Sequence, residues 1–144
     1  MTKRTRTRRQ KLVDKLDNVF SEYIRLRDCV KTTGTVDRCA CISCGKPCCG
    51  HLLHCWHFVT RWHKSVRWEE KNANWQCCAC NTFNAGEQYK HWKAIDRKYG
   101  EWTADRLVAM WNQTKKWTLD DLEWMIITFK NKKTEILNKL YNFI

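Results

Sequence analysis

The chain has 144 residues, which suffices for one compact domain with appendages and is too short for two full-sized domains. Lys and Arg number 27 against 15 Asp and Glu, so the formal net charge of +12 predicts a polyanionic partner, most often nucleic acid. No run of eighteen apolar residues and no signal-peptide pattern occurs, which argues against a membrane partner and predicts a cytoplasmic protein.

The first segment of the chain is strongly basic. Residues 1–10 contain five Lys or Arg side chains and no acid, and Lys11 continues the run. We interpret residues 1–10 as a disordered basic tail that contacts the polyanion. The alternative is a solvated tail that serves only solubility.

A helix is predicted next, over roughly residues 10–28. In "KLVDKLDNVFSEYIRLRD" the apolar side chains recur at helical spacing, and most charged side chains fall on the other side. The apolar set comprises Leu12, Leu16, Val19, Phe20, Tyr23, Ile24 and Leu26.

The middle of the chain reads as turns, short strands and a long loop. Residues 32–50 hold three of the five glycines and the only proline, Pro47, around closely spaced cysteines. Residues 51–68 mix Leu, Val, Phe, Thr and Trp with polar side chains, which suits short strands or a long loop.

The C-terminal half is predicted to be helical. A helical pattern begins near Asn81 and stops at Gly100, and a second helix starts at Ala104 with Thr103 as its cap. Thr118 and Asp121 form a capping-box pattern in front of a long amphipathic helix. We therefore divide the chain into the tail, a core over 11–100 and a helical extension over 101–144.

Two pairs of cysteines give the strongest chemical signal. A CxxC pair at Cys41 and Cys44 is followed, after 32 intervening residues, by another at Cys77 and Cys80. Four thiolates in two such pairs suit tetrahedral zinc, and four protein ligands make such an ion structural. Two alternatives are buried free thiols, and a different ligand set or second metal site that draws on other cysteines, namely Cys39, Cys48, Cys49 and Cys78.

Polar residues between and after these pairs suggest a second site. His57 and Asn72 lie between the pairs, and Asn81 follows the second pair directly. This order resembles that of HNH endonucleases, whose ββα-metal finger is braced by a four-cysteine zinc in many members. The motifs "YIRLRD", "CISCGK", "HFVTR", "NANWQCCACN" and "KYG" together resemble the NinG/Rap family of phage recombination endonucleases over roughly residues 12–110.

The resemblance implies an α+β, mainly helical fold, in which a zinc-braced HNH finger carries flanking N- and C-terminal helices. It implies a catalytic set of His57, Asn72, Asn81 and Arg61. His57 would be the general base, and Asn81 would bind one Mg²⁺ or Mn²⁺ ion beside the scissile phosphate. Asn72 would orient the loop near His57. The residues assigned to DNA contacts are Arg61, Trp62, Lys64 and Arg67.

One position departs from the family pattern. Directly before His57, where relatives carry glycine or a metal-binding aspartate, this chain has Trp56. The second ligand of the catalytic cation is therefore open, with His54 and His63 as competing candidates. Most of the nine tryptophans are expected to pack in the core, and Trp62 and Trp68 are the candidates for stacking on DNA bases.

The resemblance thus implies a metal-dependent, structure-selective endonuclease of branched DNA, such as Holliday junctions and D-loops, acting in the cytoplasm of a phage host. A homodimer through the C-terminal helix is compatible with symmetric junction cleavage. Two other functions stay open: a non-catalytic, zinc-stabilised nucleic-acid-binding module, which Trp56 favours, and an RNA-directed nuclease or RNA-binding factor.

Overall fold

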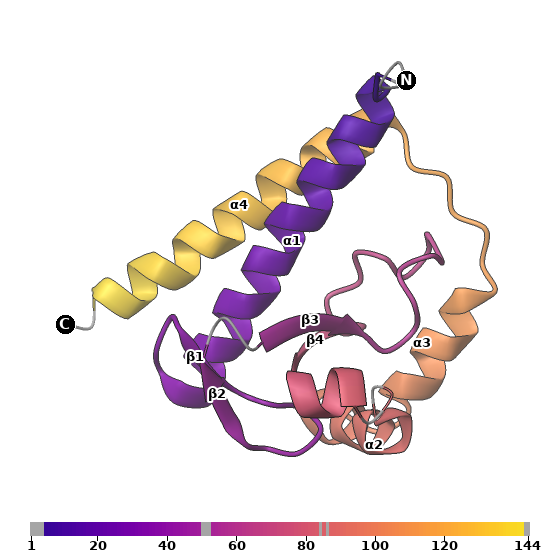
Figure 1. Cartoon of the computed structure of the whole chain (residues 1–144). Helices are drawn as coiled ribbons and strands as arrows, with labels where there is room; N and C mark the ends of the chain where they lie inside the picture. Colours follow the sequence, from indigo (N-terminus) through magenta and orange to yellow (C-terminus); the bar gives the residue numbers. More distant parts are fainter. Residues whose placement is uncertain (1–4, 50–52, 84, 86, 143–144) are drawn as a thin grey trace. The chain divides into compact units, whose positions relative to one another are not determined.

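The computed structural model describes residues 5–49, 53–83, 85 and 87–142 (Figure 1). Helices dominate and the strands are short, in agreement with the predicted mainly helical α+β class. The elements in chain order are α1 (Arg8–Thr33), β1 (Arg38–Ala40), β2 (Pro47–Cys49), β3 (Leu53–His57), β4 (Ala73–Cys77), the π-helix η2 (Ala79–Phe83), α2 (Gln88–Tyr99), α3 (Thr103–Trp111) and α4 (Leu119–Tyr141).

The strands form two antiparallel pairs. In the first pair, β1 and β2 align Cys39 with Cys48 across a turn that holds the first CxxC motif. In the second pair, β3 and β4 align Leu53 with Cys77 at one end and His57 with Ala73 at the other. The segment 58–72 between β3 and β4 contains no helix or strand and is called the β3–β4 loop below.

The predicted helices are present, but the one expected to begin near Asn81 begins at Gln88, after the separate π-helix η2. α1 extends past both predicted bounds, to Arg8 and Thr33, so part of the predicted basic tail is helical. The predicted stop at Gly100 is confirmed, with φ at 102° and its N–H bonded to the Asp96 carbonyl. The capping box of α4 is also confirmed, because Thr118 and Asp121 exchange side-chain and backbone hydrogen bonds.

The predicted cap of α3 is wrong. Thr103 lies inside the helix, and the residue before it, Trp102, makes no side-chain cap. Instead a carboxylate oxygen of Asp96 accepts the Ala104 N–H at 2.9 Å, so α2 provides the acceptor that α3 lacks locally. The Thr103 hydroxyl accepts from the Arg106 guanidinium at 2.8 Å.

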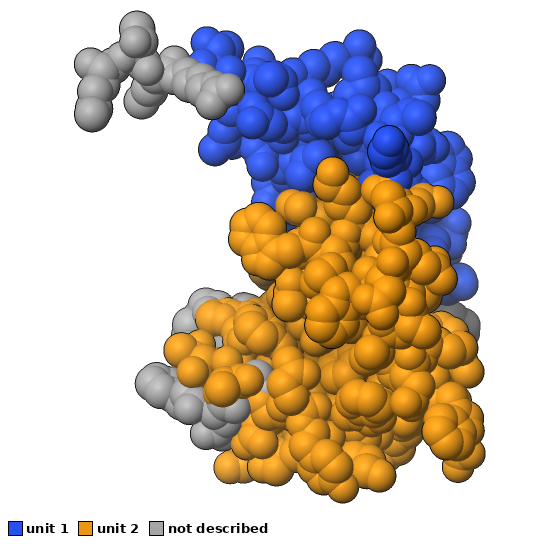
Figure 2. All heavy atoms as spheres, turned by 90° about the vertical axis from the view of Figure 1, so that its right-hand side faces the viewer, with its two compact units in different colours: residues 1–23, 116–144 blue, residues 24–115 orange. Residues whose placement is uncertain are grey.

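The chain forms two compact units, coloured separately in Figure 2. The first combines residues 1–23 with 116–144, so it joins the start of α1 to α4. Phe129 packs there on Phe20 and Tyr23, with ring centroids 4.9 and 5.3 Å apart. Arg8 pairs with Glu123 and Glu22 with Lys133, so the two helices run in the same direction.

The second unit, residues 24–115, contains the strands, η2, α2, α3 and every candidate site residue. One of its core clusters joins the β3–β4 loop to α2 and α3 through Phe58, Val59, Val66, Ile95, Ala104 and Leu107. The predicted boundaries at residues 10 and 100 divide the chain by its sequence pattern. The two units are instead defined by which residues pack together. Among the described residues, no helix is both long and apolar enough to cross a membrane.

Candidate functional site

A buried polar network lies against the β3–β4 hairpin. Asp28, at 2% exposure, accepts from the Arg27 guanidinium at 2.8 Å, from Lys98 at 2.9 Å and from the Trp75 N–H at 3.1 Å. The side-chain oxygen of Asn74 accepts from Lys98 at 3.0 Å and from the Tyr99 hydroxyl at 2.7 Å. The network therefore fixes β4 to the end of α1 and to the end of α2.

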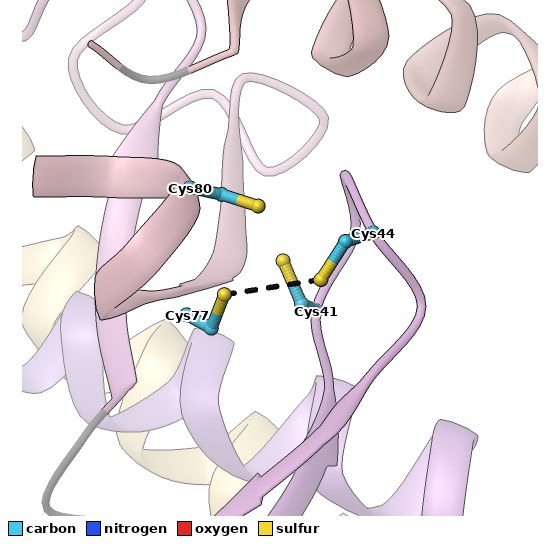
Figure 3. Close-up of side chains that lie close together, drawn as sticks. All are labelled: Cys41, Cys44, Cys77 and Cys80. Carbon is cyan, nitrogen blue, oxygen red and sulfur yellow. Dashed lines mark hydrogen bonds between the residues drawn. The ribbon is translucent and has the colours of Figure 1, made fainter. Parts of the chain in front are cut away.

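The four predicted cysteine ligands converge on one point (Figure 3). Cys41 and Cys44 lie in the turn between β1 and β2, Cys77 ends β4 and Cys80 belongs to η2. Their Sγ atoms all lie within 4.8 Å of one another, and those of Cys44 and Cys77 are 3.8 Å apart. Three of the side chains are buried and that of Cys44 is exposed.

This geometry fits a tetrahedral metal ion. With zinc–sulfur bonds of about 2.3 Å, a regular tetrahedron has sulfur–sulfur edges of about 3.8 Å, which equals the Cys44–Cys77 separation. Four thiolates also match the preference of zinc for soft ligands and leave no position for substrate. The cluster is thus placed to bind a metal ion and is compatible with structural zinc.

Burial and local hydrogen bonds act in opposite directions on the thiols of the cluster. The Gly45 N–H donates to the Cys41 carbonyl at 2.8 Å, and a φ of +71° makes glycine the favoured residue in this turn. Burial raises the pKa of Cys41 although backbone N–H groups oppose it, and burial also raises that of Cys80. At Cys77 burial acts upward too, but hydrogen bonds from the Cys80 backbone and neighbouring thiols outweigh it and lower the pKa.

Of the remaining cysteines, Cys29, Cys39, Cys48, Cys55 and Cys78 do not belong to this ligand group, although Cys48 packs against it. The side chain of Cys49 lies outside the part of the chain that the structure describes. Cys29 and Cys39 are fully buried beside Trp75, with Cys48 and Cys55 partly buried against them. Cys78 is partly buried, and its thiol lies 3.8 Å from the Thr82 hydroxyl. Among the described residues, the only His, Cys, Asp or Glu group of three or more that is placed to hold an ion is the predicted set.

His57 is the last residue of β3 and is half-buried. Its Nε2 lies 2.9 Å from the Arg67 carbonyl oxygen across the β3–β4 loop. A carbonyl can only accept a hydrogen bond, so this contact requires the proton on Nε2 and places the lone pair of a neutral ring on Nδ1.

Asn72 ties the β3–β4 loop together. It is fully buried, its Oδ1 accepts from the Val59 N–H at 2.7 Å, and its Nδ2 donates to the carbonyls of Val59 at 2.8 Å and Val66 at 3.0 Å. Val59 lies two residues after His57, and Val66 precedes the residue whose carbonyl contacts His57. The Asn72 amide therefore fixes the two backbone segments next to His57, the one that follows it and the one whose carbonyl contacts it.

Asn81, in η2, faces the strand that carries His57. Its side-chain Nδ2 lies 2.7 Å from Nδ1 of His54, which is exposed on β3. Side chains alternate along a strand, so His54 and Trp56 share one side of β3 and His57 belongs to the other. The structure thus brings together two of the three side chains assigned to the catalytic cation.

The third candidate, His63, lies in the β3–β4 loop, where its ring packs on Trp111 of α3 with centroids 4.8 Å apart. Trp56 is half-buried, and its indole nitrogen has no hydrogen-bond partner among the described residues.

The residues assigned to DNA contacts are carried by the β3–β4 loop. Arg61, Trp62 and Lys64 are exposed, Trp62 to 79%. Arg67 is half-buried, and its guanidinium lies 5.3 Å from the centre of the Trp68 ring, which is itself buried. Trp68 therefore belongs to the packed interior and does not offer a free stacking surface.

Sequence reasoning did not anticipate several contacts at this site. The Arg67 carbonyl that holds His57 is a backbone group, so no residue type signals it. The pairing of His54 with Asn81 joins positions 27 residues apart. Asp28 is the last residue of the motif "YIRLRD", and Lys98 is the first residue of "KYG". Their opposite charges were the only feature of the sequence that indicated an ion pair between them.

Mixed helices and small antiparallel hairpins surround four cysteines that are placed to bind a metal ion. Residues 1–139 match the family described as bacteriophage lambda NinG protein, and the chain therefore belongs to the NinG family. No curated protein and no solved structure matched the chain in the corresponding comparisons.

Proposed function

We propose that this NinG-family protein is a metal-dependent endonuclease that hydrolyses phosphodiester bonds in branched DNA during phage recombination. The observation that carries the proposal is the setting of His57 at the end of β3. Its Nε2 contacts the Arg67 carbonyl at 2.9 Å, and Asn72 fixes the loop on both sides of that contact.

This setting suits a general base. With its proton on Nε2, the imidazole of His57 accepts a proton at Nδ1 from a water molecule that attacks phosphorus. The resulting imidazolium still donates to the Arg67 carbonyl, and the charge strengthens that hydrogen bond. Arg61, exposed four residues further along the chain, supplies a guanidinium that binds phosphate oxygens in bidentate fashion.

Asn81 and His54 are the residues that would hold a catalytic divalent cation. Their side chains are 2.7 Å apart, and rotation of the Asn81 amide presents Oδ1 in place of Nδ2. Mg²⁺ keeps several waters and needs only one or two protein ligands, and Mn²⁺ accepts oxygen donors as well, so this small donor set fits a partly hydrated ion. Such an ion would neutralise charge on the scissile phosphate and the leaving oxygen.

Branched DNA as the substrate rests on the family and on charge. A net charge of +12 and the exposed Arg61, Trp62 and Lys64 support binding of a nucleic acid with unpaired or distorted segments. A non-catalytic nucleic-acid-binding module is the second candidate. Trp56 favours it, because this bulky side chain shares a side of β3 with the proposed ligand His54. The strand geometry also favours it, because His57 lies on the other side of β3 from His54.

Cleavage of a labelled four-way junction in Mg²⁺ or Mn²⁺ tests the proposal. Wild-type protein should cut, and H57A should bind the junction with unchanged affinity but cut at least about a hundredfold more slowly. Binding without cleavage of any DNA by wild type would leave the non-catalytic module. Faster cutting of a matched RNA junction would indicate an RNA-directed nuclease.

The proposed cation ligands have their own test. H54N should raise the Mn²⁺ concentration that gives half-maximal cleavage by about tenfold or more, without loss of cysteine-bound zinc. H63N, assayed like H54N at saturating DNA, is the matched control, because His63 packs on Trp111. If H63N shifts the Mn²⁺ dependence and H54N does not, the assignment of His54 is wrong.

A further inference from the structure

An apolar cavity of about 400 Å³ lies between the β3–β4 loop, α2 and α3. Phe58 and Trp92 form part of its wall, with ring centroids 5.6 Å apart and planes perpendicular. The Ser65 hydroxyl donates to the Met110 carbonyl at 2.7 Å, which fastens the loop to α3. The cavity therefore lies within the second unit, between elements that direct contacts hold together.

Two further aromatic side chains on the cavity wall are open to solvent. Tyr89 is 75% exposed and Trp111 is 46% exposed, whereas Phe58 behind them is only 7% exposed. Burial would account for aromatic rings that fill a core, but these two rings face both the cavity and water. A flat ligand in the cavity would therefore contact these exposed rings as well as the buried ring of Phe58.

Apolar atoms form most of the cavity wall, but three polar side chains are among the lining residues, and charged side chains lie beside lining residues. Thr60, His63 and Gln88 line it and offer a hydroxyl, an imidazole and an amide for hydrogen bonds. The ammonium of Lys93 lies 5.8 Å from the centre of the Tyr89 ring, so positive charge sits at one of the exposed walls. Arg61, next to Thr60 in the loop, adds an exposed guanidinium.

We propose that this cavity binds one unpaired nucleobase of a DNA branch, which stacks on the aromatic walls and hydrogen-bonds to the polar ones. Aromatic rings bind bases of any sequence because every base has a π-face, and the basic side chains would hold the adjoining phosphates. The volume lies within the range of small-molecule sites and accommodates a flat heterocycle. The inference deepens the proposed function and rests on it for the choice of DNA.

A base bound in this cavity would affect cleavage, because the cavity lies next to His57 in the chain. Phe58 directly follows His57, and the Asn72 amide holds both the N–H and the carbonyl of Val59, another cavity residue. A base in the cavity would hold its own strand next to His57. Intact duplex offers no unpaired base without the cost of unstacking, so the cavity would direct the protein to the point where strands separate.

Binding of a branched duplex that carries one unpaired 2-aminopurine, without added divalent cation, tests this proposal. Stacking on the aromatic walls should quench 2-aminopurine fluorescence on binding. W111A and Y89A should each weaken binding about tenfold or more and abolish the quenching. W124A is the matched control, because Trp124 is 66% exposed on α4, outside the cavity, and it should bind within about twofold of wild type.

A second substrate with an abasic site at the unpaired position separates base binding from phosphate binding. Wild type should bind this substrate about tenfold more weakly than the intact one, and W111A should bind the two equally. Equal binding of both substrates by wild type, unquenched fluorescence or an equal loss in W124A would overturn the proposal. Cleavage of junctions without quenching would refute the cavity alone, quenching without cleavage in Mg²⁺ or Mn²⁺ would refute the nuclease alone, and no DNA binding would refute both.

Discussion

The ammonium of Lys98 donates to a carboxylate oxygen of Asp28 at 2.9 Å, although 70 residues separate them in the chain. Burial raises the pKa of Asp28, but the charges of Arg27 and Lys98 outweigh burial and lower it overall. Burial lowers the pKa of Lys98, whose side chain is 25% exposed. This ion pair fixes the end of α2 to the end of α1, and the Trp75 N–H joins β4 to the same carboxylate.

Neutralising Asp28 should therefore destabilise the second unit. D28N keeps an oxygen for the Trp75 N–H but leaves two cations without their buried counter-charge, and we expect a loss of about 3 kcal/mol in the free energy of unfolding. D37N removes an exposed carboxylate nearby and should change this free energy by less than about 0.5 kcal/mol. Urea unfolding at pH 7 measures both, and equal values for the two variants would contradict the structural role of the pair.

The same pair predicts an acid dependence. The folded-state pKa of Asp28 lies below its ordinary 3.8, so wild type keeps this stabilisation above pH 4 and loses it as the pH falls through the lowered pKa. D28N has no such carboxylate. The difference in unfolding free energy between wild type and D28N should therefore shrink below about pH 4.

The cysteine cluster predicts a difference between two thiols, those of Cys80 and Cys78, that lie two positions apart in the chain. C80S removes one of four ligands, so the variant should lose its zinc and the fold around η2. Cys78 follows Cys77 in the chain but lies outside the cluster, so C78S should keep one zinc per chain. Elemental analysis of reduced protein compares them. Zinc absent from wild type, or lost equally in both variants, would argue against this ligand set.

Asn72 is predicted to act on cleavage through the position of His57. N72D keeps the acceptor for the Val59 N–H but turns both donors to the carbonyls of Val59 and Val66 into acceptors. The loop and the Arg67 carbonyl should shift, and the cleavage rate should fall about a hundredfold at saturating DNA. Junction binding should change by less than about twofold. A loss of binding with an unchanged rate at saturation would place Asn72 in DNA recognition instead.

His91 predicts a dependence of stability on pH in the acid range. Its ring is fully buried edge-on to Phe58, and neither nitrogen has a hydrogen-bond partner among the described residues. Burial, with the charge of Lys98, lowers the pKa of His91 to about 4 from its ordinary 6.5. The unfolded chain thus binds a proton between pH 6.5 and 4 that the folded chain does not, so the free energy of unfolding falls over this window and levels off below it.

The size of this effect is at most about 3 kcal/mol for one histidine. H91L removes the titrating group, so the unfolding free energy of wild type should decrease relative to H91L as the pH is lowered from 7 to 4. Zinc release in acid affects both proteins alike and drops out of the difference. Parallel curves for the two proteins would show that His91 is not held neutral.

Features that depend on neighbouring positions were predictable from the sequence. The apolar spacing around Leu16 and Phe20 predicted the helix α1, which the structure confirms. Thr118 and Asp121 predicted the capping box of α4, which is also confirmed. The two CxxC pairs identified the four thiols that converge. Each of these signals is local, because helical periodicity, caps and metal knuckles repeat at fixed short distances.

Features that depend on the path of the chain were not predictable. Thr103 carried a good cap signal, but Asp96 from the preceding helix occupies the Ala104 N–H instead. His54 and His63 were equivalent as candidate ligands until the hairpin placed one against Asn81 and the loop packed the other on Trp111. These arrangements depend on tertiary packing, which the spacing of residues in the sequence does not reveal.

Cys80 and Asn81 are neighbours on η2, so the sulfur cluster and the proposed cation ligand are one peptide bond apart. Disorder at the cluster would carry Asn81 away from His54, and added Mg²⁺ would not restore it. A newly synthesised chain would therefore lack the proposed nuclease activity until its cysteine cluster had bound an ion. Synthesis of the chain and the start of that activity would then be separate events, with metal supply between them.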